Sequence, residues 1–348
     1  MNDFITLATS GAHIPLLPIV WFAIIGIELA LYILLDGGNL GIGILSLLPQ
    51  KEDNRSLMLH VVGPIWDANE TWLLVAAGSL FGAFPAVYAI GLNALFVPAI
   101  VIAVGIILRA GSFAFFEFSE MKSLWTKVFG VGSLLVAIGH GLLFGGLLSG
   151  IKIVDGHFGG GAFDFLTPFT LLFTIGLFFA YVVLGYSALI GKIDYALQVE
   201  TFPRILGASV VTFLALLTAT FVLPNMSYIF MTAWTAAPTS YLLYLIAGAI
   251  FMTSVILGYN AIAKKNPEQM HFFAMLIFVL GYAGMVVGLF PYIVPPAVTI
   301  FDVASPDSTL KFMLYGIGPI LPIVFAYNWY LHKVFGSNFA HNKEGEGY

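Results

Sequence analysis

The chain has 348 residues, of which 60% are hydrophobic and only 9% are charged. Soluble domains carry roughly 25% charged residues, so this composition excludes an ordinary soluble protein. The net charge of −5 gives no indication of nucleic-acid binding. The absence of cysteine excludes disulfides, cysteine-ligated zinc, iron–sulfur clusters and thiolate-bound haem.

Long apolar runs dominate the sequence, and those at Leu92–Leu108 and Thr170–Leu184 contain no charged residue. Only helices and closed barrels satisfy their backbone hydrogen bonds in lipid, and these runs lack the alternation of barrel strands. The sequence therefore predicts an all-α, polytopic membrane protein in a single integral membrane domain, residues 1–348, with about nine transmembrane helices packed as bundles. The predicted spans lie near 15–48, 57–92, 94–116, 128–150, 165–190, 205–224, 238–262, 271–294 and 310–332.

The distribution of basic residues predicts the orientation. Residues Met1–Gly11 contain no Lys or Arg and no cleavage-site pattern, so the first apolar run is expected to be a retained span. Only Lys152 and Lys311 fall on one side of the predicted spans, against eleven basic residues on the other. The positive-inside rule then places the N-terminus outside and the C-terminus in the cytoplasm. The eleven are Lys51, Arg55, Arg109, Lys122, Lys127, Lys192, Arg204, Lys264, Lys265, Lys333 and Lys343.

Aromatic residues gather at two predicted outer helix ends. Such clusters are typical of the aromatic belt at the lipid headgroups, so they need no functional explanation. The residues are Phe84, Pro85 and Tyr88 at one end, and Phe290, Pro291, Tyr292 and Pro295 at the other.

Four carboxylates lie inside predicted spans: Glu28 and Asp36 in the first, Asp67 and Glu70 in the second. A charge at the centre of a transmembrane helix costs roughly 2.5–3.5 kcal/mol, so each is a functional candidate. From the helical rise, Asp36 lies roughly 20 Å and Asp67 roughly 16 Å from the cytoplasmic end. The sequence therefore predicts that these two aspartates meet on adjacent helices.

The spacing of polar residues predicts a proton pathway. Residues three or four apart share one face of a helix, and polar residues recur at these intervals in both spans. The stripe of the first span comprises Glu28, Tyr32 and Asp36, and that of the second comprises His60, Pro64, Asp67 and Thr71. Together they form a string of protonatable and hydroxyl groups that runs inward from the predicted cytoplasmic surface, with His60 near the interface.

A structural reading of the same residues stays open. Buried carboxylates also cap broken helices or pair with Lys, Arg or Asn on a neighbouring helix, and Asn39 and Asn69 are candidate partners. Glycines near Asp36 indicate either close helix packing or a locally opened helix. These glycines are Gly37, Gly38, Gly41 and Gly43.

The sequence offers no evident redox centre. Haem needs axial ligands such as His or Met, and His140 is the one histidine placed deep in a predicted span. A histidine bonded to a backbone carbonyl is the expected arrangement there. Metal-ligand clusters, phosphate loops and nucleophile triads are not recognisable either, so no catalytic redox residue and no metal ligand is predicted in this chain.

Two strings carry a family resemblance. Residues 36–43 read DGGNLGIG, and residues 63–73 read GPIWDANETWL. They resemble the signature of subunit II of cytochrome bd-type quinol oxidases, and the chain is similar to the cyanide-insensitive branch of that family. The similarity covers nearly the whole chain in order, through Phe84–Pro85, Tyr88, Thr167–Phe169, Phe290–Pro291 and Tyr330–Gly336.

The resemblance implies a haem-free subunit of a respiratory quinol:oxygen oxidoreductase in the bacterial plasma (inner) membrane. It implies a pseudo-symmetric heterodimer with subunit I, which carries the haems, b and d, and oxidises quinol, while oxygen is reduced to water and small single-span subunits are candidate partners. The family's aspartates match Asp36 and Asp67, and Trp66 matches the tryptophan near which some members bind a structural quinone. This chain is then expected to support subunit I and to help deliver cytoplasmic protons.

Two positions depart from the family pattern. Many members have a second aspartate where this chain has Asn39, and some have histidine where it has Ile65. Any proton transfer through this chain would therefore depend more on Asp36, Asp67 and Glu70. The alternatives are a proton-coupled secondary transporter, against which the halves show no repeat, and a purely structural scaffold.

Overall fold

The computed structural model describes residues 15–48, 52–190, 195–263 and 267–335. Eight helices in these ranges are long and apolar enough to cross a membrane, or nine if one bent pair counts as a span. This confirms the predicted fold class, an all-α polytopic membrane protein.

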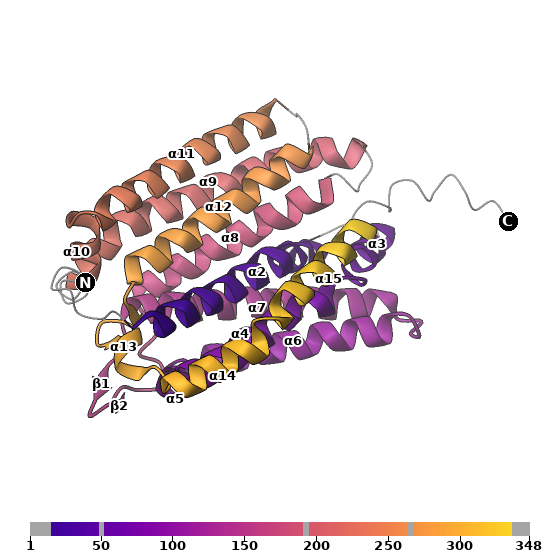
Figure 1. Ribbon diagram of the computed structural model, residues 1–348. Helices are drawn as coiled ribbons and strands as arrows, with labels where there is room; N and C mark the ends of the chain where they lie inside the picture. The colour runs from indigo at the N-terminus through magenta and orange to yellow at the C-terminus, as the bar shows by residue number, and fades with distance from the viewer. Residues whose placement is uncertain (1–14, 49–51, 191–194, 264–266, 336–348) are drawn as a thin grey trace.

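Two groups of four long helices lie side by side (Figure 1). The first bundle consists of α2 (Leu16–Ser46), α4 (Trp66–Ala83), α6 (Phe96–Phe116) and α7 (Lys122–Ser149). The second bundle consists of α8 (Pro168–Ile190), α9 (Tyr195–Met226), α11 (Thr239–Ile262) and α12 (Pro267–Leu289). Helix α8 packs against both α2 and α7, so these three helices join the bundles.

Shorter elements connect and flank the bundles. They include α3 (Glu52–Val62), α5 (Pro85–Ala94), α10 (Tyr228–Thr235), α13 (Ile300–Val303), α14 (Asp307–Ile317) and α15 (Ile320–Phe335). The candidate span Asp307–Leu331 runs through α14 and α15, whereas α4 counts as a span only together with α5. Two antiparallel hairpins pair β1 (Ile153–Val154) with β2 (His157–Phe158) and β3 (Tyr292–Val294) with β4 (Val298–Thr299). Figure 1 shows β1, β2, α10 and α13 at one end of the bundles and α3 at the other.

The range 57–92, predicted as one span, contains three helices instead. The chain leaves α3 at Val62 and starts α4 at Trp66, and a bend of 119° separates α4 from α5. Proline explains both breaks, because Pro64 and Pro85 lack the backbone N–H that a continuing helix would need. The single helix expected between His60 and Thr71 is therefore wrong.

Close packing explains the glycines of α2, which is one continuous helix. A Cβ atom on Gly41 would lie 2.0 Å from the carbonyl oxygen of Tyr181 and 2.6 Å from the backbone nitrogen of Gly185. Helices α2 and α8 therefore cross with their backbones in contact, which requires glycine on both sides. Of the two readings of these glycines, close packing is the one that holds.

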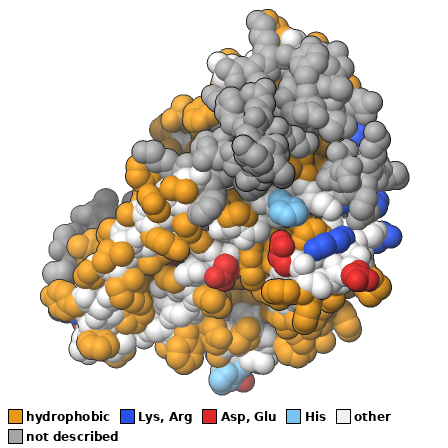
Figure 2. All heavy atoms as spheres, turned by 90° about the vertical axis from the view of Figure 1, so that its right-hand side faces the viewer, with side chains coloured by type: hydrophobic (Ala, Val, Ile, Leu, Met, Phe, Trp, Pro, Cys, Tyr) orange, Lys and Arg blue, Asp and Glu red, His pale blue; other side chains and the backbone are white. Residues whose placement is uncertain are grey.

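The side chains around the bundles are mostly apolar. Figure 2 views the molecule from the α3 end and shows charged side chains close together there, with hydrophobic side chains around them. Phe84 is fully buried in the core around Trp21 and Val87, so its assignment to an aromatic belt is wrong. It lies at the bend between α4 and α5 and belongs to the same core cluster as Trp21 of α2.

Candidate functional site

An ion pair lies in the first bundle. Arg109 on α6 donates two hydrogen bonds to Asp36 on α2, from Nη1 to Oδ2 and from Nη2 to Oδ1, each 2.7 Å long. Both side chains are fully buried. This two-pronged geometry is the strongest pairing that a guanidinium makes with a carboxylate. It holds α2 and α6 together at this depth.

Glu70 adds a second carboxylate to this pair. Its Oε1 lies 2.8 Å from Nη1 of Arg109, and its side chain is 10% exposed. That Nη1 already donates to Asp36, and the approach of Glu70 lacks the alignment of a good hydrogen bond. Asp36, Arg109 and Glu70, from three helices, are referred to below as the ion cluster.

Two asparagines support the ion cluster. Asn39 Nδ2 donates to Asp36 Oδ1 over 3.3 Å, so the predicted asparagine partner of Asp36 is confirmed. Asn69 Nδ2 donates to the backbone carbonyl of Leu35 over 3.0 Å, and this bond ties α4 to α2 beside the cluster.

Arg109 is not predicted as a site residue, because the positive-inside count places it with the basic residues of the cytoplasmic side. The structure places it inside α6, seven residues before the helix ends at Phe116. Its position within the charge-poor range 94–116 was the available signal, since an ionisable residue inside a span is a functional candidate. Without Arg109, ten basic residues remain on the predicted cytoplasmic side against two.

Asp67 and His60 lie outside the ion cluster. The break between α3 and α4 shifts the helical phase, so Glu70 faces Asp36 while Asp67 is exposed in the first turn of α4. The predicted meeting of Asp36 with Asp67 is therefore wrong. His60 is half-exposed on α3, where Nδ1 bonds the carbonyl of Ser56 over 2.7 Å and Nε2 lies 3.8 Å from Glu117.

Glu28 forms a separate polar site further along α2. It is buried and accepts a 3.1 Å hydrogen bond from Ser79 of α4. Its second oxygen, Oε2, has no hydrogen-bonding partner among the described residues. An unpaired buried carboxylate oxygen is costly unless it is protonated or hydrated.

His140 bridges two tyrosines between the ion cluster and Glu28. Its Nε2 lies 3.1 Å from the hydroxyl of Tyr32, and its Nδ1 lies 3.1 Å from that of Tyr181. The expected carbonyl partner is therefore replaced by two hydroxyls. An axial haem bond through either nitrogen would displace a tyrosine, so this histidine does not fit a haem ligand as it is placed. Within the described ranges, no group of three or more His, Asp or Glu side chains could hold a metal ion.

Trp66 lies at the start of α4. Its indole stacks on the ring of Phe113 from α6, with ring centres 4.9 Å apart and an interplanar angle of 16°. The side chain is half-buried, so part of it is open to a neighbouring molecule.

Comparison with known proteins gives one consistent family. The family described as cytochrome bd terminal oxidase subunit II matches residues 17–335. Cytochrome bd-I ubiquinol oxidase subunit 2 of Escherichia coli K12 is 30% identical over 162 residues, which are 44% of this chain and 43% of that protein. The probable cytochrome oxidase subunit 2 of Haemophilus influenzae is 26% identical over 360 residues, covering 91% of this chain and 94% of that protein. The match with the Escherichia coli relative therefore spans less than half the length of that protein.

A solved structure shares the fold. The bd oxidase of Geobacillus thermodenitrificans matches with a TM-score of 0.76 over 93% of this chain and 100% of that chain, at 15% identity. At this identity the likeness concerns the arrangement of the helices alone.

Proposed function

Because the chain belongs to the cytochrome bd terminal oxidase subunit II family, we propose that it is the haem-free subunit of a quinol:oxygen oxidoreductase. In this proposal, subunit I binds the haems and oxidises quinol in the bacterial plasma membrane. The present chain supports subunit I and takes up protons from the cytoplasm for the reduction of oxygen to water. Its N-terminus lies outside and its C-terminus in the cytoplasm.

The ion cluster is the observation that carries the proton-uptake role. Arg109 is permanently charged, so the three groups are neutral together when the two carboxylates share one proton. Burying an uncompensated ion costs several kcal/mol, which favours that single proton. Loss of this proton leaves a net negative charge that attracts the next one. The cluster can therefore bind and release protons one at a time.

Within the cluster, Glu70 is the carboxylate that exchanges the proton. Asp36 receives two short hydrogen bonds from Arg109 and a third from Asn39, so its carboxylate is the more strongly paired of the two. Glu70 has one poorly aligned contact with Arg109 and is the more exposed of the two. The weaker pairing makes protonation of Glu70 less costly.

The proposed route enters along α3 and α4. His60 and Asp67 are exposed on this side, and Glu70 follows Asp67 by about one turn of α4. Asp36 then leads along α2 to Glu28, where the free Oε2 gives a transferred proton a place to bind. Water would bridge the gaps between these groups.

Two substitutions test the route in the assembled complex. Glu70→Gln keeps the size of the side chain but holds no exchangeable carboxyl proton, so oxygen consumption should fall at least tenfold while haem content stays normal. Asp164→Asn, at an exposed carboxylate of the predicted outer loop, serves as the control and should not change turnover. Normal turnover of Glu70→Gln in a complex with full haem content would contradict the proton-uptake role and would favour the scaffold role.

A spectrum tests the wider assignment. The chain, purified from its native membrane, should co-purify with a second, unlike membrane subunit and show reduced-minus-oxidised haem bands. A colourless preparation from membranes that retain respiratory haem would favour the proton-coupled transporter instead.

Trp66 is the proposed contact for a structural quinone. Its half-buried indole offers a flat surface that is already held in place by Phe113. Extraction of quinone from the purified complex should yield less quinone per haem for Trp66→Ala than for the unsubstituted protein. An equal yield would remove Trp66 from the binding site.

A further inference from the structure

Three apolar cavities lie next to one another between the helices of the two bundles. The largest, about 340 Å³, is lined by α2, α4, α5, α6, α7, α12 and β3. A second cavity of about 120 Å³, referred to below as the middle cavity, is lined by α2, α7, α8, α9 and α12. A third cavity of about 180 Å³ is lined by α7 to α12. A cavity needs roughly 10–15 Å³ of such volume to hold one molecule the size of water, so each has room for small molecules.

Neighbouring cavities share several of their lining residues. Phe144, Tyr282 and Met285 line both the large and the middle cavity, whereas Phe173, Gly281 and Met285 line both the middle and the third. Met285 therefore borders all three. Methionine is unbranched and has three rotatable side-chain bonds, so it can change rotamer and open a connection.

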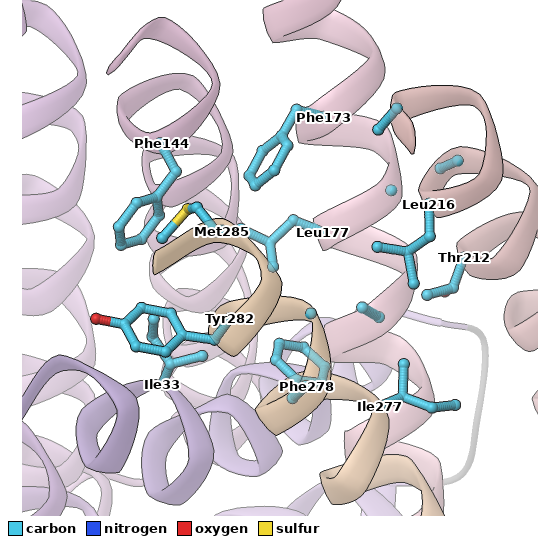
Figure 3. Close-up of a pocket in the computed structure, with 15 residues that line it drawn as sticks. Ile33, Phe144, Phe173, Leu177, Thr212, Leu216, Ile277, Phe278, Tyr282 and Met285 are labelled. Carbon is cyan, nitrogen blue, oxygen red and sulfur yellow. The ribbon is translucent and has the colours of Figure 1, made fainter. Parts of the chain in front are cut away.

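The middle cavity has almost no polar lining. Its one hydroxyl besides Tyr282 belongs to Thr212, which donates to the carbonyl of Ala208 over 2.9 Å. Figure 3 shows the hydroxyl of Tyr282 pointing away from Thr212 and Leu216, on the opposite side of this cavity. A polar head group would lose its hydrogen bonds here, whereas a small apolar molecule would not.

Both outer cavities reach exposed residues. The third cavity is lined by Leu217 of α9 and Phe251 of α11, which are 42% and 53% exposed. The large cavity is lined by Leu92 of α5, which is 44% exposed, and by Ala77 on the exposed face of α4. The series thus runs from the outer face of the second bundle to the outer face of the first.

We propose that these three cavities form a passage through which dioxygen crosses the subunit within the membrane plane, with Met285 as the gating residue. The inference rests on the proposed function, which makes dioxygen a substrate of the complex. Dioxygen is small and apolar, and dry apolar cavities in proteins take up comparable gases such as xenon. The passage would lead from lipid on the second bundle to the α4–α5 face.

Xenon tests the cavities without any substitution. A structure of the whole complex under xenon pressure should show xenon in all three cavities. A lipid or quinone tail that fills the middle cavity and persists under xenon would overturn the proposal. This result does not depend on turnover, so it separates the passage from the proposed oxidase function.

Two substitutions should narrow the passage. Gly281→Leu adds a side chain at a position where the nearest atom to an added Cβ is 4.0 Å away. Met285→Trp puts a larger side chain at the position that lines all three cavities. Each should slow the association of dioxygen with the reduced complex several-fold and raise the KM for dioxygen, with kcat at saturating dioxygen unchanged. Met285→Ala should not slow association.

The matched control is Gly248→Leu on α11, a glycine with no other atom within 4 Å of an added Cβ and an exposed position. It should bind dioxygen at the normal rate. Unchanged association in both narrowing variants, with normal haem content, would overturn the proposal. A complex with no haem or no oxygen consumption would instead overturn the proposed function.

Discussion

The two bundles use their interiors in different ways. The first bundle buries an arginine and two carboxylates between α2, α4 and α6. In the second bundle, α8 and α12 are joined by a hydrogen bond between Ser187 Oγ and His271 Nδ1, 3.0 Å apart, and the same two helices line the apolar middle cavity. A buried ionic network seldom adds stability over apolar packing, so its presence in the first bundle indicates chemistry there.

This difference predicts the largest effect for the residue that balances the charges. Arg109→Leu leaves two buried carboxylates without a cation, which should destabilise the first bundle by about 3–5 kcal/mol. Thermal unfolding of the purified complex in detergent, at a fixed scan rate, measures the change, and the yield of assembled complex should fall with it. Lys127→Met removes an exposed cation instead and should leave both unchanged. An Arg109→Leu complex with normal melting would mean that the carboxylates do not need the arginine.

The crossing that joins the bundles comes next. Gly41→Val would force a branched side chain against the backbone of α8, where no rotamer relieves the clash, and should cost about 3 kcal/mol, the upper part of the range for overpacking. The same change at Gly248 meets open space. Comparison of the two melting midpoints isolates the crossing, and equal midpoints would show that α2 and α8 can separate at little cost.

The histidine bridge should have a smaller effect. His140→Phe keeps an aromatic ring but removes the partner of two buried tyrosine hydroxyls, at a cost of about 1–3 kcal/mol. His157→Phe, at an exposed position in β2, controls for the change of residue type. Unchanged melting with unchanged haem absorption would indicate that the tyrosines find other partners.

The smallest effect on stability should come from Asp67→Asn. Because Asp67 is exposed, its replacement should change the free energy of unfolding by less than about 0.5 kcal/mol. Oxygen consumption should nevertheless fall if Asp67 supplies Glu70 with protons. The ratio of turnover to haem content separates these effects, and normal turnover would place proton entry elsewhere.

Most of the fold was predictable because lipid leaves so few alternatives. Charge-free runs of helical length identified the helices, and the strings at 36–43 and 63–73 identified the family. The division of the range 57–92 was missed because a hydropathy window averages over proline. Pro64 and Pro85 interrupt backbone hydrogen bonding without lowering the apolar content of the window.

The site was predictable only in part. Asp36, Glu70 and Glu28 could be identified as buried because a carboxylate inside an apolar run is visible in the sequence. Which of them meet could not be predicted, because the break before Trp66 resets the helical phase by an amount that the sequence does not specify. Arg109 was misassigned because the positive-inside count treats every cation near a helix end alike.

The separation of Asp36 and Arg109 along the chain has a consequence for synthesis. Their contact joins residues 73 apart, so α2 enters the membrane well before its counter-ion has been made. During that interval the stripe of Glu28, Tyr32 and Asp36 has no partner from α6 or α7. We expect α2 to be held at the insertion machinery, or by a membrane chaperone, until α6 emerges from the ribosome. A nascent chain that stops before residue 109 should therefore cross-link to that machinery through α2, and one that includes α6 and α7 should be released.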